Sequence, residues 1–244
     1  MFQGFTDETF EFFMAIQFNN NTEFFHGNHD WYVRAVRRPC LELASALNGV
    51  MSEIDGEMEL RPDRMVSRIN RDLRFSRDKS PYRDYMWLKM RRPEDADNRD
   101  RANLGFYFDI GAQESSFGMG FYEERKPHMN GLRRRLLTEP EAFLDLWRLL
   151  QSDFELHMNA FKRMKPPESL HPELLRWYPV RSFWFYHDIG DFALLKSPAL
   201  LDLLADGYRR LAPMYRYLRD IPSESDEDLT KILLKETSTL RCKE

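Results

Sequence analysis

The chain of 244 residues carries 36 lysine and arginine side chains against 40 aspartate and glutamate side chains, a formal net charge of −4. An acidic chain is not expected to coat nucleic acid. Two cysteines, Cys40 and Cys242, exclude a disulfide scaffold and a four-cysteine zinc site. No apolar stretch is long enough to cross a membrane, and the start lacks a secretory signal, so we expect a cytoplasmic protein.

The first sixty residues are predicted to be helical. Thr6 is a candidate N-cap for a helix whose apolar face begins at Phe10, and residues 19–21 should end that helix. A second helix is expected from Thr22 to residues 48–49, with a kink or break at Pro39 because proline lacks a backbone donor.

The middle of the chain has the alternation of β-strands. Strands are predicted at residues 65–70, 85–90, 103–110 and 116–122, and no helix pattern separates them. This order indicates a mostly antiparallel sheet across residues 64–122. Gly118 and Gly120 share one face of the last strand. They either lie beneath a closely packed helix or form a shallow floor that a ligand or another backbone approaches.

Helical periodicity returns after the predicted sheet. Residues 138–141 favour a helix start, and an apolar stripe from Phe143 to Phe161 predicts one continuous helix that ends at residues 166–167. Another helix begins near residue 197 and is kinked or ended by Pro213. We predict a single α+β domain over residues 1–222, with helices on both sides of the sheet in the sequence. An acidic helix or tail follows at 223–244.

Positive charge is concentrated in one segment of this acidic chain. Residues 1–63 carry 4 basic and 11 acidic side chains, whereas residues 64–101 carry 12 basic and 7 acidic ones. Six of the cations fall within residues 68–83, together with two carboxylates. Arginine is the main cation there, and its planar fork of donors suits a carboxylate or a phosphate.

The segment 68–83 is the candidate site. Its candidate ligand-binding residues are Arg68, Arg71, Arg74, Lys79, Tyr82 and Arg83, with Asp72 and Asp78 as the carboxylates that would orient the cations. The same charges could instead pair with one another and brace a partly buried loop. Arg68 and Arg71 face the same side only if the strand ends or bulges near Asn70, because side chains alternate along a strand.

Residues 68–82 read Arg-x-x-Arg-Asp-x-Arg-Phe-Ser-x-Asp-Lys-x-Pro-Tyr, where x marks the positions that vary. This string resembles the signature of an uncharacterised family, the domain of unknown function 2461. Residues 20–25 and 31–39, the strand with Gly118 and Gly120, and an arginine within 133–135 are similar to that family as well. Residues 123–126, Glu-Glu-Arg-Lys, are more charged than its pattern. The resemblance implies a single α+β domain and no established activity.

Other chemically interesting residues give weaker signals. His26 and His29 lack the further ligands of a metal site, so no metal is predicted, and no residue pattern indicates a cofactor. His187 and Asp188 are either an oriented general base or, as we expect, a turn capped by Asp188. Cys40 lies at an apolar helix position and is expected to be a small core residue. Whether the protein is an enzyme is left open by the sequence.

Three classes of function follow from these residues. The first is a binding protein or enzyme that acts on a small anionic ligand through residues 68–83. The second is a nucleic-acid contact module, against which the overall acidity argues. The third is a scaffold or interaction protein in which the arginine and aspartate side chains of the loop are purely structural.

Overall fold

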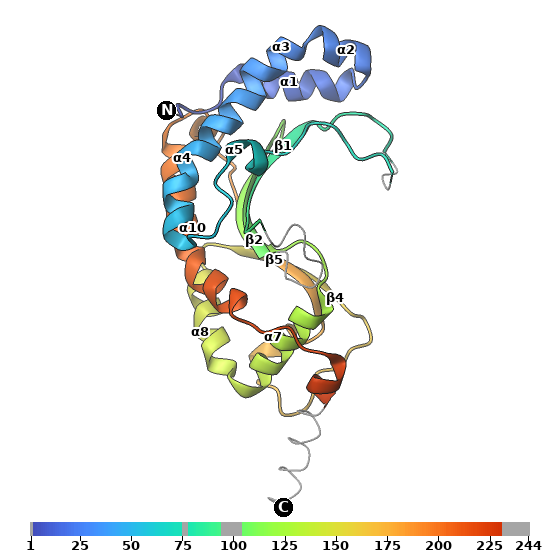
Figure 1. Ribbon diagram of the computed structural model, residues 1–244, viewed down its shortest axis with the longest axis vertical. Helices are drawn as coiled ribbons and strands as arrows, with labels where there is room; N and C mark the ends of the chain where they lie inside the picture. Colours follow the sequence, from blue (N-terminus) through green and yellow to red (C-terminus); the bar gives the residue numbers. More distant parts are fainter. Residues whose placement is uncertain (1, 75–77, 94–103, 231–244) are drawn as a thin grey trace, which may run out of the picture. The chain divides into compact units, whose positions relative to one another are not determined.

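The computed structural model describes residues 2–74, 78–93 and 104–230 (Figure 1). The chain divides into two compact units. Unit 1 comprises Met1–Arg92, Phe106–Gly118 and His187–Arg209, and unit 2 comprises Pro93–Gly105, Met119–Tyr186 and Arg210–Glu244. None of the helices in the described ranges is both long and apolar enough to span a membrane.

Five strands form one sheet in the order β1-β2-β3-β5-β4. Their bounds are β1 Tyr85–Met90, β2 Leu104–Gly111, β3 Ser115–Phe121, β4 Glu155–Ala160 and β5 Val180–Asp188. β1 pairs antiparallel with β2, and β4 pairs antiparallel with β5. Helices precede and follow the strands in the chain. The predicted α+β class with an antiparallel sheet is therefore confirmed.

Capping residues mark the starts of the first two helices of unit 1; Thr6 was predicted as a cap, and Asn21 was not. Helix α1 (Asp7–Phe18) has Thr6 as N-cap, and the backbone N–H of Thr6 donates to Thr9 Oγ1 at 3.2 Å. Helix α2 (Thr22–Gly27) has Asn21 as N-cap, whose side chain accepts a hydrogen bond from the Phe24 N–H at 2.8 Å. Side chains that satisfy the free N–H groups of the first turn fix these starts.

The single helix predicted from Thr22 to residues 48–49 is divided into several elements in its first half, and its predicted end is wrong. It is replaced by α2, α3 (His29–Tyr32), the π-helical turn η1 (Val33–Arg37) and α4 (Arg38–Ile54). Pro39 lies in the first turn of α4, where its missing N–H costs no hydrogen bond. α4 continues beyond Gly49 because Val50, Met51 and Ile54 extend its buried face.

One further expectation for unit 1 is wrong, and of the two alternatives predicted for Pro213, a kink or a helix end, the end does not occur. Residues 65–70 form no strand; the short helix α5 (Pro62–Met65) is followed by isolated bridges from Val66 to Leu88 and from Asn70 to Tyr82. After the short helix α9 (Phe192–Leu195), helix α10 (Ala199–Arg219) contains Pro213 and does not end there.

The core of unit 1 lies on one face of β1, β2 and β3. Tyr208 of α10 is fully buried; its ring contacts Phe106 and Phe117, and its hydroxyl donates to the Tyr107 carbonyl at 2.8 Å. Gly207 permits this approach, because a Cβ there would lie 2.2 Å from the Phe117 ring. Side chains that alternate with the core residues, such as Asp109 opposite Trp87, therefore lie on the other face.

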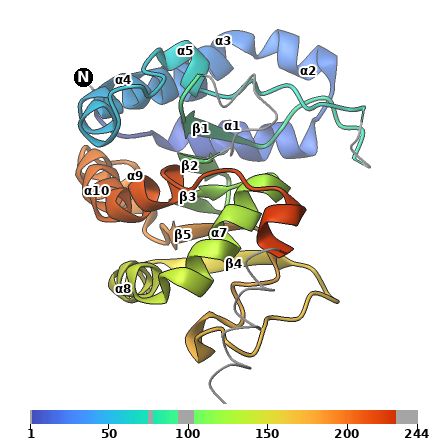
Figure 2. The ribbon, with the colours of Figure 1, turned by 60° about the horizontal axis from the view of Figure 1, so that its bottom comes forward.

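Unit 2 contains two elements that the sequence analysis did not predict, helix α7 (Lys126–Thr138) and strand β5. The continuous helix predicted over residues 143–161 is also wrong. Helix α8 (Pro140–Leu150) ends at a turn, and strand β4 follows it (Figure 2). β4 is an edge strand whose residues alternate between polar and apolar side chains, a strand pattern that coincides with part of the apolar stripe of the predicted helix. The short 3₁₀ turn η2 (Pro172–Leu174) precedes β5, and residues 226–230 begin a terminal helix.

Candidate functional site

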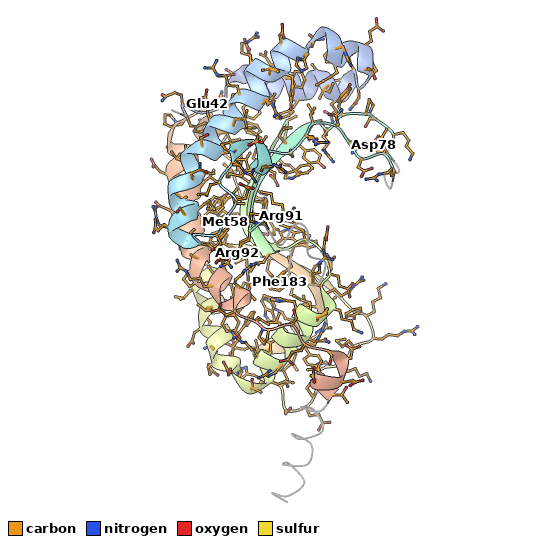
Figure 3. All side chains as sticks on the ribbon, viewed as in Figure 1. Glu42, Met58, Asp78, Arg91, Arg92 and Phe183 are labelled. Atoms are coloured by element: carbon orange, nitrogen blue, oxygen red, sulfur yellow. The ribbon has the colours of Figure 1, made fainter. Side chains whose placement is uncertain are left out.

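The signature segment forms the base of a hairpin-like loop. The Arg71 N–H donates to the Pro81 carbonyl at 2.8 Å, and the Arg83 N–H donates to the Ile69 carbonyl at 2.8 Å. Residues 72–74 and 78–80 are the described part of the loop beyond these contacts. Asp78 is labelled there in Figure 3.

Several cations of this loop make contacts inside it. Arg74 forms a bidentate pair with Asp72 at 2.8 and 3.0 Å, and this pair is exposed. Arg71 pairs with Asp78 at 3.2 Å. Lys79 donates to the Leu73 carbonyl at 2.9 Å. Asp72 and Asp78 therefore each form an ion pair with one arginine of the same loop.

Arg83 and Arg68 differ in their surroundings. The Arg83 guanidinium donates to the carbonyls of Arg68 and Asn70 at 2.8 and 2.6 Å, and it lies 4.5 Å from the centroid of the Trp87 ring. Arg68 has an exposed side chain that forms no hydrogen bond or ion pair with the described residues. Among the described cations of this segment, Arg68 is thus the most available to a ligand.

Asn20, Phe25 and Tyr82 form a group of contacts that we call the clamp. The Asn20 side chain donates to the Tyr82 carbonyl at 2.9 Å and accepts from the Tyr82 N–H at 3.0 Å. Its amide group thus satisfies both backbone groups of Tyr82, as a neighbouring strand would. The ring of Phe25 stacks on the ring of Tyr82, with the centroids 4.1 Å apart. The clamp therefore joins two segments of the family resemblance, residues 20–25 and 68–82, which are far apart in the chain.

The two glycines of β3 are both buried. A Cβ on Gly120 would lie 2.3 Å from the Phe183 carbonyl oxygen and 2.4 Å from Trp184 Cα. Gly120 thus permits the close approach of another backbone, that of β5.

An open cavity of about 400 Å³ lies in unit 1. The residues that line it are Gln17, Asp84, Tyr85, Asp109, Ile110, Gly111, Ala112, Gln113 and Glu114. Asp84 and Tyr85 follow the signature segment directly, and Gln17 comes from the last turn of α1. The clamp therefore ties Asn20, three residues after Gln17, to Tyr82, two residues before Asp84.

The charged residues that line the cavity are all acidic. They are Asp84, Asp109 and Glu114, and no lysine or arginine lines the space. None of the three carboxylates forms an ion pair within the described ranges. The ion pairs of the described arginines lie mostly at the surface and involve other carboxylates. The sequence analysis missed these residues. The signal that could have found them is Asp109, the one charged residue in the otherwise apolar segment 103–111.

Asp109 has a strongly perturbed pKa. Its Oδ1 accepts from the Ser116 N–H at 2.7 Å, and its Oδ2 accepts from the Ser116 hydroxyl at 3.1 Å. Burial, together with the charges of Asp188 and Glu114, raises the pKa of Asp109 to about 6, against the hydrogen bonds from Ser116, which lower it. A perturbed carboxyl group in a cavity marks a candidate functional site.

Five other residues singled out in the sequence lie among contacts that stabilise the fold. Cys40 is fully buried in α4, and burial raises the pKa of its thiol to about 12, which fits a core residue. His187 and Asp188 are the last residues of β5, so the expected turn is wrong, and the His187 ring contacts Phe117. The rings of His26 and His29 both contact Phe25. Among the described residues, no group of three or more possible ligands is placed to hold a metal ion.

Comparison with known proteins identifies the family. A search of the curated proteins found no match. A family model described as "Conserved hypothetical protein (DUF2461)" matches residues 8–217. This range includes the clamp, the signature segment and every residue of the cavity. The chain therefore belongs to the family of conserved hypothetical proteins DUF2461.

Proposed function

We propose that the protein binds a small molecule with a positively charged group, an amine or a guanidinium, in the acidic cavity of unit 1. The observation that carries this proposal is that the cavity presents Asp84, Asp109 and Glu114 without a cation partner among the described residues. A ligand cation would supply the missing partner.

The energetics favour such a ligand. Asp109 is partly buried, so its negative charge has lost hydration without gaining a protein cation. A unit positive charge at 4 Å from a carboxylate gains about 4 kcal/mol at the effective dielectric constant of a site near the surface. Tyr85 also lines the cavity, and an aromatic face attracts a cation. The Gln17 amide would add an orienting hydrogen bond.

The proposal gives the signature segment a positioning role. Tyr82 is held by Asn20 and Phe25, and the chain continues within two residues to Asp84 and Tyr85. The internally paired arginines would then stabilise the loop that carries this wall, and the acidic residues beyond it would contact the ligand.

Titration calorimetry with n-butylamine and agmatine tests the proposal. We expect saturable binding at pH 7.5, and about tenfold weaker binding to Asp109→Asn or Glu114→Gln, because each variant removes one charge near the ligand. Asp202→Asn, which removes an exposed carboxylate on α10, should bind like the parent protein. Absence of saturable amine binding, or equal binding by all variants, would refute the proposal.

A second candidate function is the binding of a small anion by the signature segment, and the exposed Arg68 side chain favours it. Inorganic pyrophosphate should then raise the melting temperature of the parent protein, and Arg68→Ala should lose this increase. Arg38→Ala, which removes an exposed arginine of α4, is the control. If pyrophosphate has the same effect on Arg68→Ala, the anion site is wrong. Steeply salt-dependent binding of an oligonucleotide would instead favour nucleic-acid contact.

A further inference from the structure

Apolar side chains are exposed on α1 beside the acidic cavity. Gln17 of this helix lines the cavity. Met14 precedes Gln17 by one turn, and Phe18 is its neighbour in the chain. Residues three and four apart are neighbours on a helix surface, so Met14 adjoins both of them. Met14 is 51% exposed and Phe18 is 80% exposed.

Tyr85 adds to this exposed apolar surface, whereas Phe10 of α1 does not. Tyr85, which lines the cavity itself, is 40% exposed. Along α1, Phe10 lies one turn before Met14, and its ring contacts Phe192 with the centroids 5.2 Å apart. Phe10 is buried, so the exposed apolar surface of α1 beside the cavity consists of Met14 and Phe18.

We infer that the ligand is an amphipathic amine, whose charged group occupies the acidic cavity and whose alkyl or aryl group lies on Met14 and Phe18. The inference rests on the proposed function and names the class of its ligand. It is carried by the juxtaposition, through one residue, Gln17, of exposed apolar side chains with carboxylates that form no ion pair among the described residues. A fully polar cation would leave these apolar side chains in water, whereas an amphipathic one would cover them.

The inference predicts a dependence of affinity on chain length. A fully buried methylene group increases affinity about fourfold, and a methylene that lies on an open surface is expected to contribute about twofold. From n-butylamine to n-octylamine, four methylene groups are added, so we expect affinity to rise by about 15-fold or more. The gain should come from Met14 and Phe18, whereas the charged group should bind equally in all members of the series.

Titration calorimetry with n-butylamine, n-hexylamine and n-octylamine, below their micelle concentrations, tests this inference. In Met14→Ser and Phe18→Ser we expect unchanged binding of n-butylamine and a flat or much shallower dependence on chain length. Both positions are exposed, so the fold should tolerate serine. Leu149→Ser is the matched control, because Leu149 is 69% exposed on α8 in unit 2. n-Octanoate, which has the wrong charge, should not bind in the cavity.

The outcomes separate the two proposals. If n-butylamine binds but longer amines bind no better, the apolar contact is wrong and the cation site stands. If the increase with chain length persists in both serine variants, or if n-octanoate binds as well as n-octylamine, the apolar group lies elsewhere and the inference is wrong. If no amine binds, the proposed function fails, and the inference fails with it.

Discussion

Replacement of Arg133 by methionine is expected to lower the free energy of unfolding by about 3–5 kcal/mol. Arg133 lies on α7 in unit 2 and is 1% exposed. Its guanidinium donates to the carbonyls of Tyr178 and Val180 at 2.8 and 2.7 Å, and to Asn130 Oδ1 at 2.8 Å. Methionine fills a similar volume but leaves three buried acceptors without a donor.

Lysine at the same position should also destabilise the protein, by a smaller amount. A lysine keeps the charge but replaces the planar fork by a single ammonium group, which cannot reach all three acceptors. Burial lowers the pKa of the Arg133 guanidinium, so a more weakly basic lysine is expected to lose its proton more readily in this place.

Urea unfolding followed by tryptophan fluorescence measures this effect. Trp147, Trp177 and Trp184 lie in unit 2 and report on its unfolding. Arg148→Met is the control in the same unit, because Arg148 forms solvent-exposed ion pairs that contribute at most about 1 kcal/mol. A loss below 1 kcal/mol for Arg133→Met would show that the three contacts do not hold α7 against the start of β5.

Replacement of Asp109 by asparagine is expected to stabilise the protein above pH 6, by about 2–3 kcal/mol. Burial raises the pKa of Asp109 from 3.8 to about 6, so between these values the folded state binds more protons than the unfolded state. Stability conferred by the neutral acid is therefore complete below pH 3.8 and is lost as the pH rises through 6. Asparagine is neutral at every pH, and its side-chain oxygen can still accept from Ser116.

Calorimetric melting temperatures at pH values from 4 to 8 check this prediction. Asp109→Asn should match the parent protein near pH 4 and exceed it increasingly up to pH 7. Burial lowers the pKa of His128 to about 4, so this residue makes stability rise with pH between 4 and 6.5. His128 acts equally in both proteins, and its effect cancels from their difference. A variant that melts below the parent at pH 7.5 would contradict the prediction.

The two effects of Asp109 belong together. A carboxylate that destabilises the folded protein at neutral pH has no stabilising role that would explain its presence, and functional sites often carry such a cost. The same variant should bind amines more weakly, so increased stability and reduced binding are expected from one substitution. A variant that gains stability but keeps amine binding would separate the two properties and contradict the proposed function.

Local sequence signals predicted much of the fold. Thr6 marks the start of α1 because its capping interaction involves a residue only three positions away. The alternation of residues 103–110 and 116–122 predicts β2 and β3 because one side of each strand faces the core. The family could be identified for a similar reason, since the string at residues 68–82 is contiguous.

Contacts distant in sequence were decided only by the tertiary structure. The apolar stripe from Phe143 to Phe161 fits a helix, but residues 155–160, which also alternate between polar and apolar side chains, become a strand because β5 supplies their backbone partners. The role of Asn20 depends on Tyr82, 62 positions away. The arginine surplus of the signature segment suggested an anion site, whereas the folded chain brings Asp84, directly after this segment, to a cavity with two more carboxylates, and none of the three forms an ion pair among the described residues. Composition and spacing thus determined the class, the family and the approximate starts of α1, α8 and α10. The cavity required the structure, because its walls come from α1, the start of β1, the end of β2 and the turn after it, which only folding brings together.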